Sequence, residues 1–367
     1  MVFPPQGSGK IVISQGGGGA GKEAERFILV AASDADESIK SVADYVCDGV
    51  NDEEEINQAI QQAVSEGIYT VVLSEGTFNV EPHTIELMGG TLYCCIPITS
   101  SNVRLIGCGD KTVISLKPEL TEEYAFVIAI TGNETEYINN ISLENLNIKT
   151  NYQPYRHFLL LLTAVDNSSI ANIILDSSES SNYGMFTSTL CQNISVTNIV
   201  SYNTATRIMY SSNFKVTDST LYLNSDLTTA LTVLDSSKVT INRNTIYSPN
   251  YTISLYNSNF VSITQNLLNN LTEIRVSSEI LFSNNQVIDS GQAIYTYTPL
   301  RCILSNNIFY SNKETSVIIK LANGDDYCVV TNNIIYATNF TGQNPIEYTG
   351  SNHVIANNII IVESGGG

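Results

Sequence analysis

Three features of the sequence predict an all-β fold, a right-handed, single-stranded parallel β-helix of about 10 to 13 coils with an N-terminal capping α-helix. An eight-residue apolar pattern recurs at intervals that match the length of one coil. β-Branched residues are frequent while Lys and Arg together number only 17, which favours strands over helices. One segment alone has clear helical apolar spacing, and it precedes the repeats.

The N-terminal segment is predicted to be separate from the core. Residues 1 to about 40 form a flexible, Gly-rich lead-in in this prediction, because Gly16 to Gly19 interrupt any periodicity. Residues 41–367 are predicted as one β-helix domain. No basic start followed by an apolar stretch is present, so no signal peptide is evident. We expect the lead-in to attach the chain to a larger particle.

A helix is predicted at about residues 52–66. Asn51 or Asp52 can cap its start, and the three glutamates that follow suit the positive end of the helix dipole. Gly67 lies just past its end. Its apolar face consists of Ile56, Ala59, Ile60, Ala63 and Val64. We expect this face to cover apolar residues at the start of the β-helix.

The repeat is typified by Val239-x-Ile241-x-x-Asn244-x-Ile246. Strand residues alternate between faces, so apolar residues two apart point inward, and the chain then bends at the Asn into the next strand. Asn tolerates left-handed backbone angles, and stacking brings successive Asn side chains into hydrogen-bonding range. The Asn recurs as Asn244, Asn266, Asn285, Asn307, Asn333 and Asn358. Earlier copies carry Leu146, Ile173, Ile199 or Ser219 there, and copies follow one another after about 19 to 27 residues.

Sequence motifs around the predicted helix resemble a known superfamily. Residues 47–52 read Cys-Asp-Gly-Val-Asn-Asp, and residues 76–78, at the end of the following strand, read Gly-Thr-Phe. This order and spacing resemble the N-terminal signature of the pectate-lyase-3-like, or pectin-lyase-fold, superfamily, and the coil repeats extend the resemblance over most of the chain. Residues 31–49 are most similar to phage tailspike and tail-fibre proteins. The resemblance implies a parallel β-helix but leaves the function open, because the superfamily includes lyases, hydrolases, epimerases and glycan-binding tailspikes.

Composition excludes several classes of partner. A formal net charge of -19 repels phosphate backbones, so we expect no nucleic acid. No apolar run approaches the roughly 18 to 20 residues of a membrane span, so we expect no membrane insertion. The seven cysteines are an odd number within apolar patterns, which favours buried reduced thiols. A surface rich in Asn, Ser, Thr and Tyr suits a polysaccharide or cell-surface glycan, in a virion or an extracellular setting.

Candidate catalytic residues cluster in the coils between about 150 and 230. A hydrolase of this kind needs two carboxylates, and Asp176 and Asp226 lie two coils apart, roughly 10 Å along the axis. The candidate catalytic set is Asp176, Glu179, Arg207 and Asp226, with Tyr155, Arg156 and His157 on a neighbouring loop as substrate-binding candidates. No cofactor is expected, except that a lyase could use Ca²⁺. The alternative is that these are scattered polar loop residues.

A second candidate is a column of tyrosines. The position just after the last apolar residue of the repeat is Tyr in five of ten copies, namely Tyr202, Tyr222, Tyr247, Tyr310 and Tyr336. Strand alternation turns this position outward, so coil stacking should align these side chains along one edge. Tyrosine offers a ring for a sugar face and a hydroxyl for its edge. Alternatively, these rings stack to shield the strand corner or lie in an oligomer interface.

Three functional hypotheses follow. The first is a tailspike-like virion or surface protein that recognises a host polysaccharide, as a homotrimer attached through its N-terminus. The second is a polysaccharide-degrading enzyme, either a glycoside hydrolase or a polysaccharide lyase. The third is a non-catalytic structural adhesin or filament subunit. The sequence leaves open which glycan is bound, whether catalysis occurs, the oligomeric state, and whether the native chain extends beyond residue 367.

Overall fold

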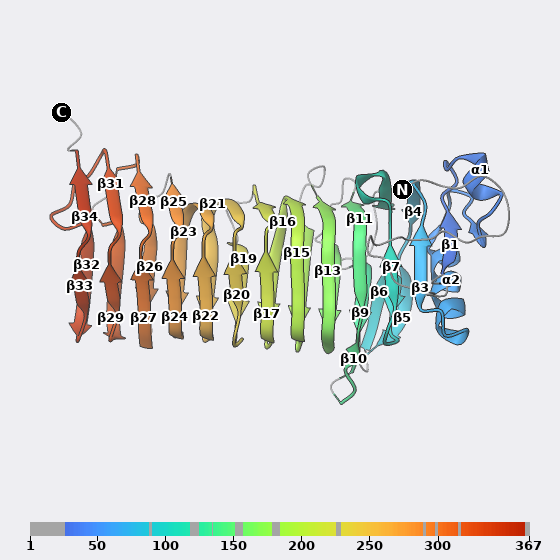
Figure 1. The fold of residues 1–367 in the computed structure, drawn as a ribbon, viewed down its shortest axis with the longest axis horizontal. Coiled ribbons are helices and arrows are strands. Elements are labelled where there is room, and N and C mark those ends of the chain that lie inside the picture. Colours follow the sequence, from blue (N-terminus) through green and yellow to red (C-terminus); the bar gives the residue numbers. More distant parts are fainter. Residues whose placement is uncertain are drawn as a thin grey trace, which may run out of the picture.

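The computed structural model describes residues 26–87, 90–117, 125–133, 135–150, 157–177, 184–224, 229–288, 291–297, 300–314 and 317–363. The described residues form one elongated rod, with strands crossing its long axis and both α-helices at the N-terminal end (Figure 1). All strands join one continuous hydrogen-bonded sheet, which wraps around the axis as three ladders. Every pairing between the named strands is parallel except that of β5 (His83–Leu87) with β6 (Gly90–Ile98).

Five long strands bend from one ladder into the next: β11 (Ser142–Thr150), β13 (Val165–Asp176), β15 (Gln192–Tyr202), β21 (Thr245–Tyr256) and β23 (Leu267–Arg275). The first ladder takes the N-terminal parts of β11, β13 and β15, together with β1 (Ile28–Ala31), β3 (Thr70–Leu73), β7 (Arg104–Ile106), β17 (Ser212–Thr217), β20 (Thr240–Asn242), β22 (Asn259–Thr264), β24 (Ser278–Ser283), β27 (Leu300–Ser305), β30 (Val329–Thr331) and β33 (Val354–Ala356). It has thirteen rungs among the described residues, in agreement with the predicted number of coils.

The second ladder takes the C-terminal parts of β11, β13 and β15 and the N-terminal parts of β21 and β23, together with β4 (Gly76–Val80), β8 (Thr112–Leu116), β18 (Thr220–Tyr222), β25 (Gln286–Ile288), β28 (Ile308–Ser311), β31 (Ile334–Ala337) and β34 (Ile359–Val362).

The third ladder takes the C-terminal parts of β21 and β23, together with β6, β9 (Ala125–Thr131), β12 (His157–Thr163), β14 (Gly184–Thr189), β16 (Thr204–Met209), β19 (Thr229–Leu234), β26 (Ile294–Tyr297), β29 (Ile319–Asp326) and β32 (Ile346–Ser351). The remaining elements are α1 (Glu37–Lys40), β2 (Tyr45–Val46), α2 (Glu53–Ser65), the 3₁₀ turn η1 (Gly109–Lys111) and β10 (Ile138–Asn139).

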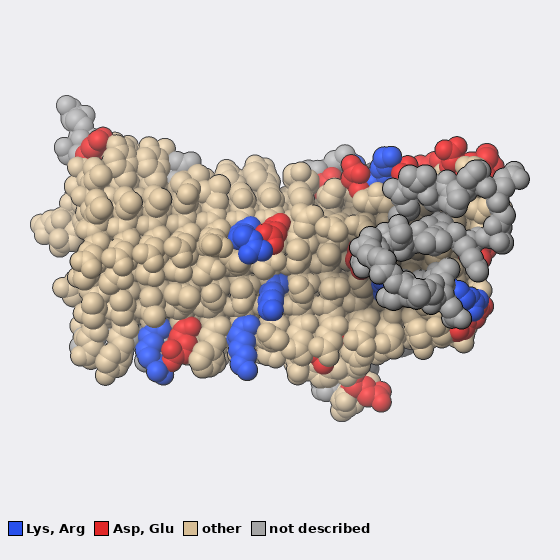
Figure 2. Space-filling view, viewed as in Figure 1, with Lys and Arg blue, Asp and Glu red and all other residues tan. Residues whose placement is uncertain are grey.

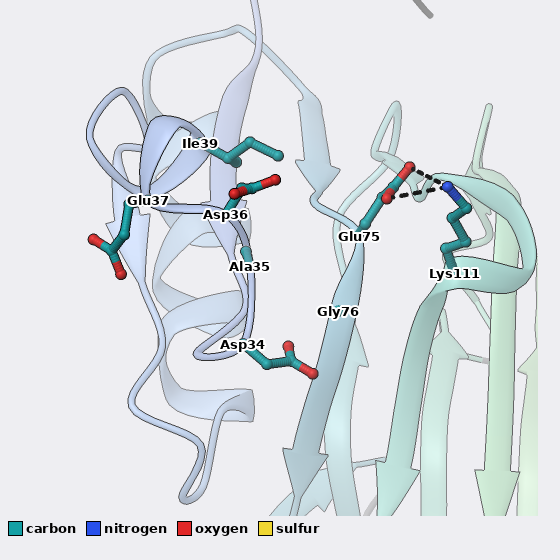
Figure 3. Close-up of a pocket in the computed structure, with 8 residues that line it drawn as sticks. All are labelled: Asp34, Ala35, Asp36, Glu37, Ile39, Glu75, Gly76 and Lys111. Atoms are coloured by element: carbon teal, nitrogen blue, oxygen red, sulfur yellow. Dashed lines mark hydrogen bonds and ion pairs between the residues drawn. The ribbon is translucent and has the colours of Figure 1, made fainter.

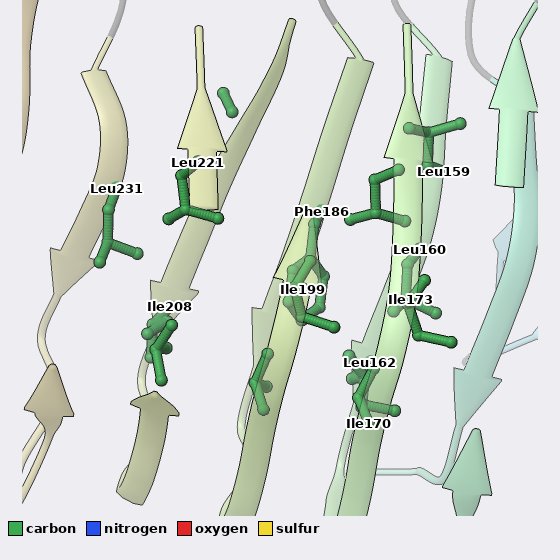
Figure 4. Packing of buried hydrophobic residues seen from close by; sticks show 14 of the residues in the cluster. Leu159, Leu160, Leu162, Ile170, Ile173, Phe186, Ile199, Ile208, Leu221 and Leu231 are labelled. Carbon is green, nitrogen blue, oxygen red and sulfur yellow. The ribbon is translucent and has the colours of Figure 1, made fainter. Parts of the chain in front are cut away.

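The interior is a continuous apolar column. In the first ladder, Ile241, Ile263, Phe282 and Leu304 are consecutive register partners, and all four are fully buried. Side chains from the three ladders meet in this column, as Figure 4 shows for the middle coils, where Ile173 and Ile199 pack near Leu160 and Phe186. The spacing of two between apolar residues therefore predicted the buried face correctly.

The Asn ladder exists and closes the bend between the first and second ladders. The side-chain nitrogen Nδ2 of Asn285 donates to Oδ1 of Asn307 at 3.2 Å and to the backbone carbonyl of Ile263 at 2.9 Å. Its own Oδ1 accepts from the backbone N–H of Asn266 at 2.9 Å. Equivalent bonds connect Asn244, Asn266, Asn285, Asn307, Asn333 and Asn358.

The expected reason for Asn at this position was partly wrong. The residue with the left-handed backbone is the preceding one, as at Asn284, whose φ is 56°. The ladder Asn is favoured because its side chain reaches both the next amide and a buried carbonyl, which satisfies backbone groups of the turn.

A row of serines forms a similar hydrogen-bond ladder at the bend between the third and first strand ladders. The sequence analysis did not predict it. The backbone N–H of Ser236 donates to Oγ of Ser258 at 3.2 Å, and that of Ser258 donates to Oγ of Ser277 at 3.1 Å. The hydroxyl of Ser258 in turn donates to the carbonyl of Tyr256 at 3.0 Å. The bend therefore keeps its buried polar groups paired without asparagine.

Helix α2 occupies the predicted place, and its apolar residues Ile56, Ala59, Ile60 and Ala63 belong to the main hydrophobic core. It lies at the N-terminal end of the rod, beside β1 and β3 (Figure 1). Asp52 stands at the N-cap position, but its carboxylate bonds to no amide of the helix. The carboxylate instead accepts the N–H of Gly49 at 2.8 Å and that of Asn79 at 2.7 Å.

Candidate functional site

The predicted tyrosine column is present as a row on the outer face of the second ladder. Consecutive register partners are Lys149, Asp176, Tyr202, Tyr222, Tyr247, Asn269 and Ile288, and farther along the ladder Tyr310 pairs with Tyr336 and Tyr336 with Ile361. We call the tyrosines of this series the tyrosine row. One residue per coil fixes their separation at the strand spacing. The alignment predicted from strand alternation is therefore correct.

The rings of the tyrosine row stack in pairs. Tyr222 and Tyr247 lie 4.7 Å apart between ring centroids at 9°, and Tyr310 and Tyr336 lie 5.4 Å apart at 7°. Tyr202, at the start of the row, is the most open, with 45% of its surface exposed. Stacking covers one face of each paired ring, so these pairs present mainly ring edges and hydroxyls outward. The hydroxyl of Tyr336 donates to Glu363 at 2.9 Å, which raises the pKa of this phenol.

Asp176 lies next to the tyrosine row. It is the last residue of β13, half-buried, and is the register partner of Tyr202 on the next coil and of Lys149 on the previous one. A carboxylate, an open aromatic ring and paired phenols therefore follow one another along three successive coil steps. Such a sequence of groups offers hydrogen-bond acceptors, donors and an apolar surface to one extended ligand.

Arg207 lies on a different ladder from Asp176. It belongs to β16 and to an outer row of the third ladder, where its register partners are Thr187 and Thr232. Its guanidinium forms no ion pair with any carboxylate of the described residues. The two residues share the coils around 176–207 but stand on separate faces of the rod, so each is available to a ligand from its own side.

The other predicted site residues divide into two groups. Tyr155, Arg156, Glu179 and Asp226 lie outside the described residues. His157 begins β12 and is 2% exposed, so its side chain lies in the protein rather than on the glycan-accessible surface that the sequence suggested.

The sequence analysis did not predict one cluster of polar side chains on the third ladder. Glu273 accepts from the guanidinium of Arg275 at 2.5 Å and from the hydroxyl of Ser254 at 3.5 Å, and its side chain is only 9% exposed. The bond to Glu273 raises the pKa of Arg275, and the nearby Tyr251 and Tyr295 raise this pKa further. Glu273 and Arg275 lie two residues apart on β23, and only the pairing of β23 with β21 and β26 brings Ser254 and Tyr295 beside them.

A cleft of about 620 Å³ lies at the N-terminal end, far along the chain from the tyrosine row. Asp34 and Asp36 stand on one wall, while Glu75 and Lys111 form an ion pair of 3.2 Å on the other (Figure 3). The carboxylate of Asp34 also accepts the N–H of Thr77 at 2.9 Å. The acidic groups are thus partly engaged in joining the first coils.

Among the residues that the structure describes, two groups of side chains place three metal-ligating atoms close together, and both lie around α2. They are Cys47, Asp52 and Glu55, and Glu53, Glu54 and His83. Structural bonds already engage the central members, because Asp52 binds two backbone amides and Glu53 binds His83 and the N–H of Glu81. These groups therefore serve to join α2 to the strands that follow it.

Comparison with known proteins identifies the fold. Residues 229–367 match the family model described as "Right handed beta helix region". This chain is a right-handed parallel β-helix. A search of curated protein sequences finds no match. No helix among the described residues has the length and apolarity that crossing a bilayer requires.

Solved structures with this right-handed β-helix fold carry different activities. A GH136 lacto-N-biosidase from Eubacterium ramulus aligns with a TM-score of 0.62 and 11% identity, over 91% of this chain and 68% of that one. PfbA, a surface adhesin of Streptococcus pneumoniae, aligns at 0.61 and 14% identity, over 86% and 90%. Tailspike protein 3 of bacteriophage CBA120 aligns at 0.53 and 10% identity, over 82% and 58%. At these identities the likeness shows the fold alone.

Proposed function

We propose that this right-handed β-helix recognises a cell-surface polysaccharide along its second ladder, as a tailspike-like virion or surface protein. The observation that carries the proposal is the row formed by Asp176, Tyr202, Tyr222 and Tyr247, which are consecutive register partners. An extended glycan meets a repeating surface of phenols and one carboxylate there, at the spacing of the coils. The presence of a tailspike and an adhesin among the proteins of similar fold supports this reading.

The proposal is tested by removing rings from the row. Tyr202→Ala combined with Tyr222→Ala should weaken glycan binding by about tenfold or more, because buried aromatic contacts dominate the energy of such surfaces. Binding is measured on a glycan array and then by calorimetry with the glycan that binds best. Tyr256→Ala is the matched control, since Tyr256 is 46% exposed but lies on the third ladder.

A wild-type chain that binds no glycan on the array would sink the proposal. An equal loss of binding in the Tyr256→Ala control would also contradict it, because the third ladder would then carry the site. Thermal unfolding of all variants separates a binding defect from a folding defect.

The second candidate is a polysaccharide-degrading enzyme, favoured by the position of Asp176 directly beside Tyr202. In this case Asp176 and Asp226 act as the carboxylate pair with Glu179 assisting, and a lyase would add Ca²⁺, whereas Arg207 stands on another face of the rod and takes no part. Replacing Asp176 by Asn should abolish depolymerisation while weakening glycan binding less than the combined Tyr202→Ala and Tyr222→Ala substitutions do. Unchanged depolymerisation in Asp176→Asn would remove this residue from the catalytic set.

Assembly and attachment belong to the same proposal. A homotrimer attached to a larger particle through the part of residues 1 to about 40 that precedes β1 would present several second ladders to one surface and raise the effective affinity by avidity. The third hypothesis, a purely structural adhesin or filament subunit, predicts no glycan binding by any ladder. The array experiment therefore distinguishes it from the first two.

A further inference from the structure

The outer surface of the C-terminal coils is unusually apolar. On the first ladder, Leu281, Ile303, Val329 and Val354 are consecutive outward register partners. On the second ladder the outward row contains Leu267, Gln286, Ile308, Ile334 and Ile359. The same rows carry polar side chains in earlier coils, such as Thr240 and Ser262 on the first and Thr245 on the second. We call the aliphatic parts of these two rows the apolar face.

The exposure of the apolar face does not arise from the end of the chain. Ile303, Ile308 and Ile334 are each paired with a strand on both sides, yet they are 43%, 42% and 39% exposed. Their inward neighbours Leu304, Phe309 and Ile335 are fully buried. The outward aliphatic side chains therefore contribute nothing to the core, and their surface remains in water.

Charge is sparse in the same region, where the ion pair of Arg301 with Glu279 lies at the N-terminal ends of β27 and β24. Residues 229–367 hold six of the Lys and Arg residues and nine of the Asp and Glu residues, so they carry -3 of the net charge of -19. Over the C-terminal coils, Figure 2 shows a broad face almost without charged side chains. A chain this acidic repels its own copies elsewhere on its surface, but the apolar face lacks that repulsion.

We propose that the apolar face binds the same face of a second copy of this chain. Its aliphatic side chains recur once per coil, at the strand spacing of about 4.8 Å, so the best complementary surface has the same repeat. A second copy of these rows provides that repeat, and its side chains can pack between those of the first. The low polarity of the face disfavours a glycan as occupant.

The size of the apolar face fits this role. Seven of its eight aliphatic residues are at least 36% exposed, which amounts to roughly several hundred Å² and is a large share of the roughly 800 Å² that each partner contributes to a standard interface. The two rows are separated by the exposed bend residues Asn284, Asn306 and Asn332, and exposed aliphatic surface of this extent marks protein interaction sites. This inference does not rest on the proposed glycan binding, because Tyr202, Tyr222 and Tyr247 lie outside the apolar face.

The test compares the full chain with Ile308→Thr combined with Ile334→Thr. Threonine keeps the β-branched shape that strands favour but places a hydroxyl in the interface. By sedimentation equilibrium the wild-type chain should form an assembly of two or more copies, each of 40.0 kDa. The dissociation constant of the assembly should be at least about tenfold higher for the double variant than for the wild type, since apolar anchors dominate such interfaces.

Val42→Thr combined with Val46→Thr is the matched control, because both valines are exposed but lie at the N-terminal end. It should associate like the wild type. Ile303→Lys, on the other row of the face, should also dissociate the assembly, and thermal unfolding checks that each variant is folded. A wild-type chain that sediments at 40.0 kDa at every concentration overturns the inference, as does a folded Thr pair that associates like the wild type. Neither result affects the glycan experiment.

Discussion

At the residue scale, the Asp-Gly-x-x-Asp motif acts as a clamp between α2 and the first coils. Asp52 accepts the backbone N–H groups of Gly49 and Asn79, and Asn79 lies 27 residues beyond Asp52 in the chain. Gly49 has a φ of 92°, and a Cβ there would approach Oγ of Ser33 to 2.9 Å. A residue with a side chain would therefore be strained and crowded at this position. The motif therefore supplies both carboxylate oxygens and a backbone position without a side chain, and the clamp uses all three.

Asp52→Asn should destabilise the protein by about 1–3 kcal/mol, because the amide nitrogen would face a backbone donor and leave it unpaired. The change is measured as a lower midpoint of chemical denaturation. Asp48→Asn is the control, since Oδ1 of Asp48 accepts the N–H of Val50 and asparagine retains an oxygen there. Equal effects of the two substitutions would contradict the clamp.

At the element scale, the bends determine where each strand ends. The chain turns in one left-handed residue, such as Asn284, and the following Asn satisfies the backbone groups that the turn exposes. Strands on either side keep their parallel partners in consecutive coils. Regular ladders of Asn and Ser thus allow short turns to repeat without buried unpaired groups.

Asn285→Ala should cost about 2–4 kcal/mol, because it removes bonds to Asn307 and Ile263 and leaves buried acceptors and donors unpaired. The neighbouring substitution Asn284→Gly is the control, since Asn284 is exposed and glycine adopts its positive φ readily. Chemical denaturation should show a large loss for the first and a change near zero for the second. Hydrogen exchange should locate the weakened region in the coils of β25 and β28.

At the scale of the whole molecule, the three ladders enclose one column from which water is excluded. None of the seven cysteines forms a disulfide, and six of them are buried. Burial raises the pKa of Cys94 and of Cys191 to about 12, against an ordinary value of 9.0. The thiols, rather than the reactive thiolates, are therefore the native species at neutral pH.

In the folded protein at pH 8, a thiol reagent should modify only Cys108, and slowly, whereas denaturation should release all seven thiols. Because the folded pKa values are raised, the stability from these groups is present below about pH 9 and is lost as the pH rises toward 12. Rapid native modification of several thiols would contradict a closed column. Denaturation at pH 7 and pH 10 measures the loss of stability.

Local sequence patterns were enough to predict the coils of the β-helix, helix α2 and the register between successive coils. Inward residues such as Ile241 and Ile263 recur at a spacing of two within strands, and the Asn recurs once per coil, so local pattern and stacking agree. The outward alignment of the tyrosine row followed from the same alternation. These features are predictable because each depends on residues close together in one coil, repeated in the next.

Which face of the rod each side chain occupies could be seen only in the tertiary structure. It placed Arg207 on a ladder apart from Asp176, buried His157, and joined Glu273, Arg275 and Ser254 through pairings between coils. It also turned two separate sets of aliphatic residues into one apolar face. The physical reason is that loops of unequal length set the position of each ladder around the axis, and no local pattern encodes the surface that neighbouring coils build together.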